Sequence, residues 1–237
     1  MNDSPSLYLL PVPIGAEVQA EIPADVINQT IQLRYFVVEK IRTARRYLRR
    51  IDPGFPIDDS QFLEMGKRSD KASYRSFLQA AFDGKHDVGV MSEAGCPAVA
   101  DPGVDIVAQA YEVGFEIKPM VGPSSILLAL MASGMDGQRF AFNGYLPVNA
   151  KDRKQAIRRF EKQSAQSRQT QLFIETPYRN NQLLEALLQQ LGEQTQLCVV
   201  VSLLTPDQCV YRNSVGQWRK QKQPDLHKLP AIFLLLA

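Results

Sequence analysis

The chain has 237 residues, of which 45% are hydrophobic and 22% are charged, and its formal net charge is +2. This composition is that of a globular protein with a real core and excludes a disordered or fibrous chain. A net charge so close to zero does not indicate binding to nucleic acid or to a membrane. Any argument for such binding has to depend on local patches of charge.

Cysteines and chain ends indicate the compartment. Cys96, Cys198 and Cys209 lie far apart, without a CxxC pair, which favours a reducing compartment over a disulfide framework or a zinc site. The first five residues lack the basic start of a signal peptide. The apolar run 232–236 is far shorter than the roughly 20 residues that a bilayer span needs, and it predicts a buried strand. We expect a cytoplasmic protein without a membrane span.

Apolar strands that run into elbows rich in Gly, Pro and Ser occur four times. The strands and their elbows are 7–12 with 13–15, 88–91 with 92–97, 117–121 with 122–125, and 172–174 with 175–177. Continuous apolar runs are typical of buried parallel strands, and ligands of such sheets lie beyond the carboxyl ends of the strands. The elbows therefore predict a ligand held largely by backbone groups.

Strand and helix signals alternate along the chain, which predicts an α/β fold with largely parallel sheets. Further strands are expected near 33–38, 139–144, 170–175, 197–203, 209–213 and 231–236. Helices are expected at 40–50, from Ser69 to Gly84, from Asp101-Pro102 to Gly114, at 124–131, and from Thr176-Pro177 to Gly192. The elbow at residues 121–123 divides the chain into predicted domains 1–121 and 122–237.

Two basic stretches are candidate nucleic-acid contacts. Arg42, Arg45, Arg46 and Arg49 fall at i, i+3, i+4 and i+7, which places them on one helix stripe. A second stretch holds Lys151, Arg153, Lys154, Arg158, Arg159 and Lys162. Such stripes can neutralise phosphates, although a charge run is also typical of a solvated helix face.

Five segments together resemble one family. They are residues 7–15 (LYLLPVPIG), 92–103 (SEAGCPAVADPG), 121–134 (VGPSS with ASG), 140–147 (FAFNGYLP) and 173–179 (FIETPYR). In this order they resemble the motifs of the tetrapyrrole methylase superfamily, in its small-subunit ribosomal RNA methyltransferase I branch. The resemblance covers about residues 7–191.

This resemblance implies two α/β domains with S-adenosylmethionine (SAM) in the cleft between them, usually in a homodimer. It also implies methyl transfer to a cytidine ribose 2′-hydroxyl of small-subunit ribosomal RNA, and hence the small ribosomal subunit as partner. Other branches methylate porphyrin precursors or a protein-bound precursor of diphthine.

The resemblance also implies a set of cofactor-binding residues, and no metal. These are Pro13, Gly15, Glu93, Gly95, Cys96, Ser124, Ser125, Phe173, Leu203, Leu204, Pro230 and Ala231. Cys96 lacks a nearby histidine in the sequence, so its thiol is interpreted as a bystander to a backbone contact and not as a nucleophile.

Substrate positioning is assigned to Glu39, Glu175 and Arg179, because a ribose hydroxyl needs a nearby base and a phosphate suits a guanidinium. The alternative for Glu175 and Arg179 is a surface ion pair at a helix start. The predicted RNA contacts are Arg42, Arg45, Arg46, Arg49, Gly144 and Tyr145.

The chain departs from the family pattern at several positions. Lys40 stands where relatives have an acid, Glu93 replaces an aspartate, and Ala16 replaces an asparagine. Leu203 and Leu204 stand where a charged pair is expected. Two alternatives therefore stay open: a methylase of a tetrapyrrole or another small molecule, and a SAM- or RNA-binding homologue without catalysis.

Overall fold

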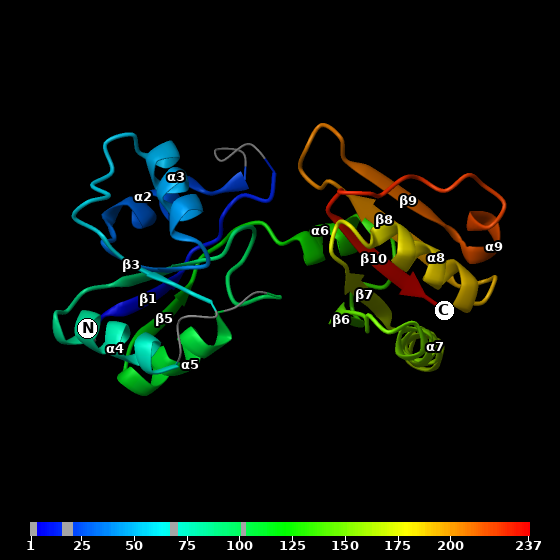
Figure 1. Cartoon of the computed structure of the whole chain (residues 1–237), viewed down its shortest axis with the longest axis horizontal. Helices are drawn as coiled ribbons and strands as arrows, with labels where there is room; N and C mark the ends of the chain where they lie inside the picture. Colours follow the sequence, from blue (N-terminus) through cyan, green and yellow to red (C-terminus); the bar gives the residue numbers. More distant parts are fainter. Residues whose placement is uncertain (1–3, 16–20, 67–70, 101–102) are drawn as a thin grey trace. The chain divides into compact units, whose positions relative to one another are not determined.

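The computed structural model describes residues 4–15, 21–66, 71–100 and 103–237. The chain divides into two compact units, Met1–Ser124 and Ser125–Ala237, each built on its own sheet (Figure 1). The predicted division lay between residues 121 and 122. Within the described ranges no helix combines the length and the apolar character that a bilayer span requires.

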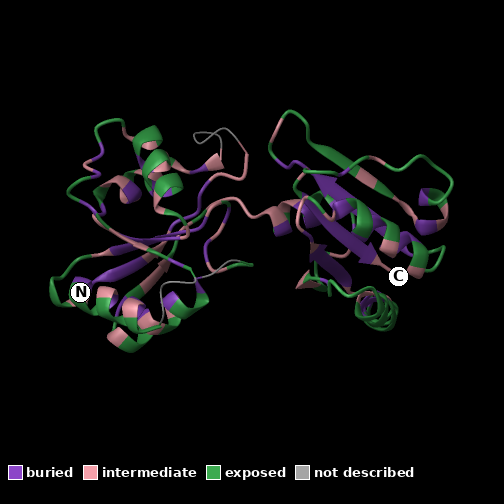
Figure 2. Cartoon of the chain, in the orientation of Figure 1, coloured by how far each residue is buried: buried purple, intermediate pink, exposed green. Residues whose placement is uncertain are grey.

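The N-terminal unit contains a parallel sheet of five strands in the order β3-β2-β4-β1-β5. The strands are β1 (Ser6–Leu9), β2 (Tyr35–Val38), β3 (Gln61–Glu64), β4 (Val88–Met91) and β5 (Glu116–Pro119). All four residues of the central strand β4 are buried, as its apolar run predicts, and Figure 2 shows the inner strands of this sheet buried. The carboxyl ends of all five strands therefore meet at one edge.

Helices cover both faces of this sheet (Figure 1). The helices are α2 (Ala24–Gln32), α3 (Ile41–Ile51), α4 (Lys71–Asp83) and α5 (Val104–Val113). Ala44 and Leu48 of α3 pack in a core with Phe36, whereas Leu78 of α4 and Ile106 of α5 pack in a core on the other face. Apolar residues that share one side of each helix thus supply the packing on both faces.

The C-terminal unit contains a mixed sheet in the order β6-β7-β10-β8-β9, in which only β6 and β7 pair in parallel. Its elements are α6 (Ser125–Ser133), β6 (Phe140–Tyr145), α7 (Ala150–Ser167), β7 (Thr170–Ile174), α8 (Asn180–Gln190), β8 (Gln196–Val201), β9 (Cys209–Ser214), α9 (Val215–Trp218) and β10 (Ala231–Leu236). Helices α7 and α8 share a core with Phe173 and Phe233 of the sheet. Helix α6 packs against β8 and β10.

The expected α/β fold is confirmed, with local differences. Helix α8 begins at Asn180 and not at Thr176-Pro177, because the Arg179 N–H bonds to the Thr176 carbonyl at 2.8 Å and forms a turn there. Helix α5 begins at Val104, with Gly103 at its N-cap position. The predicted caps Ser69 and Asp101-Pro102, and Ala16, lie outside the described residues. Helices α2, α7 and α9 and strand β3 were not predicted.

Candidate active site

Three of the four predicted elbows belong to the N-terminal unit, and they contact one another. Val12 and Gly95 exchange two backbone hydrogen bonds of 3.0 Å, which join the first elbow to the second. The Cys96 thiol donates a hydrogen bond of 3.3 Å to the Pro123 carbonyl, which joins the second elbow to the third. The three elbows form one platform at the carboxyl edge of the parallel sheet, as the ligand-site rule for such sheets predicts.

Glycine is required where the elbows touch. A Cβ at Gly122 would lie 2.2 Å from the Pro11 ring, so no other residue fits at that position. Gly95 has a φ of 72°, which favours glycine, but a Cβ there would meet its nearest atom, the Pro123 carbonyl oxygen, at 3.5 Å. Glycine is therefore needed at position 122 because a side chain would collide with Pro11, and at position 95 because the backbone has a positive φ.

The backbone directly after the second elbow is strained. Ala98 and Ala100 have φ angles of 65° and 62°, values that residues with a Cβ adopt at a cost. In the C-terminal unit, Ser202 and Leu204 have φ angles of 50° and 60°. Strained non-glycine residues cluster at ligand sites in proteins, and here both pairs lie in or beside segments predicted to bind the cofactor.

A charged network holds the second elbow against β2 and α3. The Glu39 carboxylate accepts a hydrogen bond of 2.9 Å from the Glu93 N–H. The Lys40 ammonium lies 2.7 Å from Glu93 Oε2, and the Thr43 hydroxyl donates to the same oxygen at 3.4 Å. The hydrogen bond to Glu93, followed by the charge of that carboxylate, raises the pKa of Lys40 above its usual value. Glu39 therefore positions the elbow, and Lys40 positions the Glu93 side chain.

A cavity of about 290 Å³ opens between the first elbow, α3 and the start of the second elbow. It is lined by Val12, Pro13, Gly15, Thr43, Ala44, Arg46, Tyr47, Arg50, Met91, Ser92 and Glu93. The lining thus combines two arginines and a glutamate with three hydroxyl-bearing residues and with apolar residues such as Val12 and Met91. The Tyr47 hydroxyl is buried without a hydrogen-bond partner among the described residues, and burial raises the pKa of Tyr47 to about 12.

The first elbow already holds an anion from its own chain. The Glu21 carboxylate accepts hydrogen bonds from the Ile14 N–H at 2.6 Å and from the Gly15 N–H at 3.1 Å. Two adjacent N–H groups that converge on a carboxylate form an anion site. Pro13 and Gly15, which were predicted to bind the cofactor, line the cavity. The N–H groups of Ile14 and Gly15, however, are already bonded to Glu21.

The predicted arginine stripe of α3 is divided between different contacts. Arg46 lines the cavity. The Arg45 guanidinium lies over the Phe62 ring, 5.1 Å from its centroid, and Arg49 donates to the Pro53 carbonyl at 2.7 Å. Arg42 is exposed. One of the four predicted arginines thus reaches the cavity, with Arg50 beside it.

In the C-terminal unit the predicted residues after β8 meet those before β10. The Ser202 N–H donates to the Pro230 carbonyl at 2.9 Å, and Ala231 pairs with Val201 in the sheet. Leu203 is 8% exposed and Leu204 is 38% exposed. These segments form a second backbone platform, within which Leu204 presents its side chain to solvent.

Glu175 and Arg179 form a pair in which the carboxylate is buried. Arg179 Nη2 lies 2.6 Å from Glu175 Oε1, and the Thr176 N–H donates to the same oxygen at 2.6 Å. The Glu175 side chain is 1% exposed, whereas that of Arg179 is 31% exposed. The predicted alternative, an ion pair just before a helix, is present, although its carboxylate is buried. A buried carboxylate that holds Arg179 fits Glu175 better than the predicted role of a base.

The other predicted residues of this unit lie at different depths. Phe173 is wholly buried and packs against Phe160, with ring centroids 5.3 Å apart, so its side chain serves the core. Gly144 has a φ of 63° at a register shift in β6, and the following Tyr145 is 57% exposed. Ser125 begins α6, and Ser124 is the last residue of the N-terminal unit.

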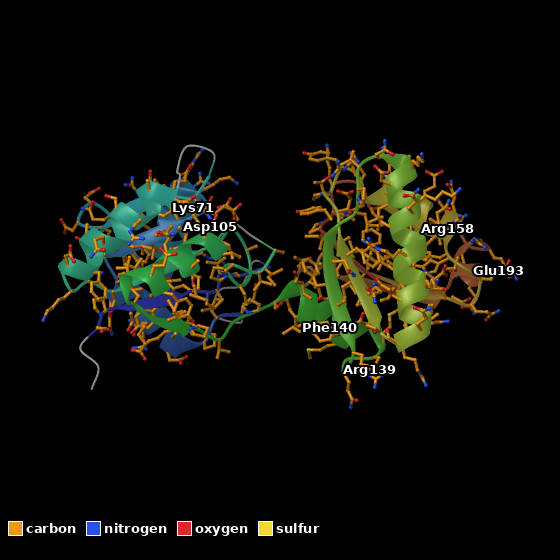
Figure 3. The ribbon with its side chains drawn as sticks, turned by 90° about the horizontal axis from the view of Figure 1, so that it is seen from below. Lys71, Asp105, Arg139, Phe140, Arg158 and Glu193 are labelled. Carbon is orange, nitrogen blue, oxygen red and sulfur yellow. The ribbon has the colours of Figure 1, made fainter. Side chains whose placement is uncertain are left out.

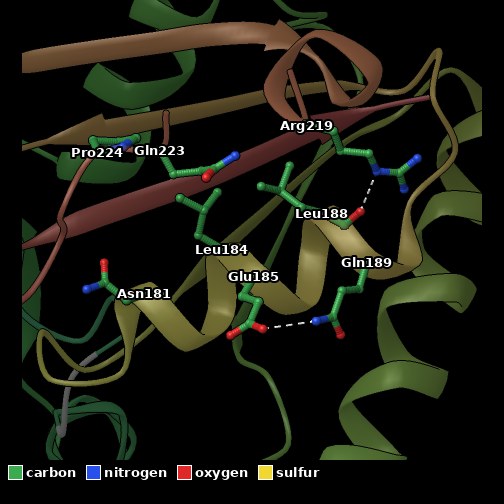
Figure 4. Close-up of a pocket in the computed structure, with 8 residues that line it drawn as sticks. All are labelled: Asn181, Leu184, Glu185, Leu188, Gln189, Arg219, Gln223 and Pro224. Carbon is green, nitrogen blue, oxygen red and sulfur yellow. Dashed lines mark hydrogen bonds between the residues drawn. The ribbon is translucent and has the colours of Figure 1, made fainter. Parts of the chain in front are cut away.

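A larger cavity, of about 700 Å³, lies in the C-terminal unit between α8 and residues 219–224 (Figure 4). Eight described residues line it, and no predicted site residue is among them. Arg219 is already engaged there, because its guanidinium donates to the carbonyls of Leu188 and Leu191, each at 2.8 Å. The smaller cavity of the N-terminal unit therefore fits the predicted chemistry better.

Sequence reasoning missed most of the α3 wall of the smaller cavity. Thr43, Tyr47 and Arg50 were not predicted, although with Arg46 they recur at i, i+3, i+4 and i+7. That helical spacing was the signal that would have found them. Within the described ranges no three His, Cys, Asp or Glu side chains are grouped to hold a metal ion.

Comparisons with known proteins agree with these motifs. Residues 24–218 match the family model of the tetrapyrrole (corrin/porphyrin) methylases. Ribosomal RNA small subunit methyltransferase I of Vibrio cholerae is 27% identical over 202 residues, which cover 85% of this chain and 66% of that protein. The protein of the same name from Escherichia coli O157:H7 is 24% identical over 225 residues, covering 94% of this chain and 74% of its own length.

Solved structures confirm the fold. The crystal structure of the methyltransferase CobJ matches with a TM-score of 0.64 at 15% identity, covering 98% of this chain and 94% of that one. The sequence relatives are longer than the region they share with this chain, which spans about two thirds of the Vibrio cholerae protein.

Proposed function

Because the chain belongs to the tetrapyrrole (corrin/porphyrin) methylase family, we propose that it is a SAM-dependent methyltransferase that acts on small-subunit ribosomal RNA. The relatives named ribosomal RNA small subunit methyltransferase I support this acceptor. The observation that carries the proposal is the platform of three elbows beside a cavity with two arginines and a carboxylate.

The residues present fit a cofactor held by backbone groups. Leu204 is a predicted cofactor ligand with a positive φ, and Ala98, Ala100 and Ser202, also with positive φ, lie within four residues of predicted ligands. Our candidates for its ligands are the second elbow at Glu93, Gly95 and Cys96, residues 124–125, residues 203–204, and residues 230–231. SAM supplies an activated methyl group when bound.

The chain's own residues have to orient the acceptor and exclude water. In-line methyl transfer needs the nucleophile and the methyl carbon at about 3–3.5 Å in a desolvated site, which is a positioning task. Arg46 and Arg50 line the cavity and supply charge for phosphates of the acceptor strand. Glu39 fixes the second elbow, and Glu93 presents a carboxylate at the cavity wall.

The finer features of the proposal concern position and assembly. The acceptor atom is a ribose 2′-hydroxyl, with Arg179 held by Glu175 for contact with a phosphate. The protein acts in the cytoplasm as a homodimer. Tyr145, exposed at the end of β6, supplies a ring for base stacking.

The proposal is tested by incubating the purified protein with tritiated SAM and small ribosomal subunits from a strain that lacks the gene. Label is expected in the RNA fraction, in a nucleoside that mass spectrometry identifies as 2′-O-methylated. A tetrapyrrole that takes the label while RNA does not would replace the acceptor. SAM binding by calorimetry without turnover on any acceptor would leave a binding protein and overturn the enzyme assignment.

A further inference from the structure

Helix α7 carries a concentration of positive charge that the proposed methyl-transfer site does not use. Its 18 residues include six Lys or Arg residues and two acidic residues. Arg139 extends this charge beyond the helix, because its guanidinium donates to the Ser167 carbonyl at the end of α7. Figure 3 shows Arg158 on α7, with Arg139 and the partly exposed Phe140 near one end of the helix.

Packing fixes which side of α7 faces solvent. Ala156, Ile157 and Phe160 are buried in the core of the C-terminal unit. Three cations at i, i+4 and i+8 are exposed, namely Lys154, Arg158 and Lys162. We call these three residues the α7 cationic face. Because the apolar side is anchored in the core, this face is held outward and is not free to rotate.

Glu161, the acidic residue next to Lys162, does not pair with this face. The Glu161 carboxylate is engaged elsewhere, since it accepts hydrogen bonds from the Gly192 N–H at 2.6 Å and from the Thr195 hydroxyl at 2.5 Å. In the parts of the chain that the structure describes, no ion pair involves the α7 cationic face.

The spacing of these cations works against the helix itself. Like charges at i and i+4 destabilise a helix, and Lys154 with Arg158, and Arg158 with Lys162, form two such pairs. An ordinary solvated face intersperses the two signs of charge. A local rule that is broken without a compensating contact points to a functional surface.

We propose that the α7 cationic face binds the sugar-phosphate backbone of the RNA substrate; this inference rests on the proposed function. From Lys154 to Lys162 the helix axis rises about 12 Å, at 1.5 Å per residue. Phosphates on one strand of a duplex recur about every 3.4 Å of axis, so this length spans about four phosphates. The three cations, which rise about 6 Å from one to the next, can therefore contact phosphates of one short run of the strand.

An anionic membrane surface fits this helix less well. A helix that lies in a membrane interface inserts an apolar face, whereas the apolar face of α7 is already packed in the core. The exposed side offers charge and no bulky apolar residues, which is the chemistry of phosphate neutralisation.

The test compares two full-length triple variants of equal charge. In one, Lys154, Arg158 and Lys162 are changed to Gln; in the control, the exposed Lys220, Lys222 and Lys228 of the same unit are changed to Gln. Binding of a fluorescein-labelled single-stranded RNA is followed by anisotropy at several KCl concentrations. Each lost contact should lower the slope of log affinity against log salt by about 0.7, so the α7 variant loses about 2. The control stays within about 0.5 of wild type.

Equal slopes for the two variants, or no RNA binding by the wild type, would overturn the proposal, as would binding of phosphatidylserine vesicles in place of RNA. Thermal melting checks the fold, and the charge-conserving Lys154→Arg/Lys162→Arg variant has to keep the wild-type slope. Methyl transfer is assayed in parallel. If the wild type methylates RNA but the α7 variant keeps the wild-type slope, RNA binding by the α7 cationic face is refuted and the proposed function stands. If the α7 variant has a reduced slope but the wild type transfers no methyl group, the RNA-binding face stands and the proposed function is refuted.

Discussion

The Lys40 ammonium lies 2.7 Å from a Glu93 carboxylate oxygen, so two residues at which the chain departs from its family's motifs form a pair with each other. The longer side chain of Glu93 reaches the lysine, while its backbone N–H is held by Glu39. Glu64 lies close enough to Lys40 to raise the lysine pKa further. The ion pair with Lys40 and the hydrogen bond from Thr43 attach the Glu93 side chain to the start of α3.

Lys40→Asp should lower the melting temperature by a few degrees at pH 7 and have less effect near pH 4. At neutral pH the new carboxylate repels Glu93 and Glu39, and protonation relieves this repulsion in acid. The charge-swapped variant Lys40→Glu/Glu93→Lys should recover most of the loss. Melting curves at both pH values measure the effect, and a pH-independent loss would contradict it.

Arg46→Gln should raise the KM for RNA about tenfold with a small change in kcat. Loss of one charge-assisted hydrogen bond of about 1.5 kcal/mol corresponds to that factor. Arg49→Gln is the matched control, because Arg49 donates to the Pro53 carbonyl and is not among the residues that line the cavity. Steady-state methyl-transfer kinetics would refute the assignment if both variants behaved alike.

The wild type should lose folding stability above pH 10 because of Tyr47, and the Tyr47→Phe variant should lack this contribution. Burial raises the pKa of Tyr47 to about 12, whereas the unfolded chain titrates near 10. As the pH rises from 10 to 12 the unfolded state loses the proton first, so the wild type should lose about 3 kcal/mol of folding free energy. Below pH 10 the variant should be at least as stable, because the buried hydroxyl has no partner. Urea denaturation at pH 8 and pH 11 tests this, and a variant with the wild-type pH dependence would count against it.

Gly122→Ala should destabilise the N-terminal unit far more than Gly95→Ala. An alanine Cβ at 122 would lie 2.2 Å from Pro11, and such overpacking costs about 3 kcal/mol or more. At 95 the side chain has room, and only the positive φ is penalised, by about 1 kcal/mol. Chemical denaturation of the two variants gives the order, and the reverse order would show that backbone conformation dominates.

Glu175→Gln and Arg179→Ala should reduce methyl transfer to a similar extent, and their combination should be no worse than Arg179→Ala alone. This follows if the buried carboxylate acts only by holding the guanidinium, at 2.6 Å. A double-mutant cycle on kcat/KM measures the coupling. Additive losses, or a loss of kcat confined to Glu175→Gln, would indicate an independent role for the carboxylate.

The sequence predicted the parts of the fold that depend on simple periodicity. The apolar run 88–91 predicted a buried strand, and the segment from Ser69 to Gly84 predicted a helix; β4 and α4 are the corresponding elements, with Tyr74, Leu78 and Ala81 buried on one side of α4. Strand β3, with its exposed Gln61 and Glu64, was missed because edge strands lack a continuous apolar run.

The site was predicted in part. The elbows were found because Gly and Pro mark tight backbone, and contacts such as that of Gly122 with Pro11 depend on it. The spacing of the arginines alone did not predict which side of α3 faces the cavity. Burial of Ala44 and Leu48 turns Thr43 and Arg46 to the cavity and Arg49 toward Pro53. Phe173 belongs to a family motif, but the alternation of side chains along β7 directs it into the core.

Strand β10 lies between β7 and β8, although it follows both of them in the chain. During synthesis, β7 and β8 therefore emerge before the strand that joins them, and each exposes an apolar edge until residues 231–236 arrive. The N-terminal unit has all of its strands by Pro119 and can fold first. The nascent protein thus passes through a stage in which the N-terminal unit has all of its strands and the C-terminal sheet still lacks β10.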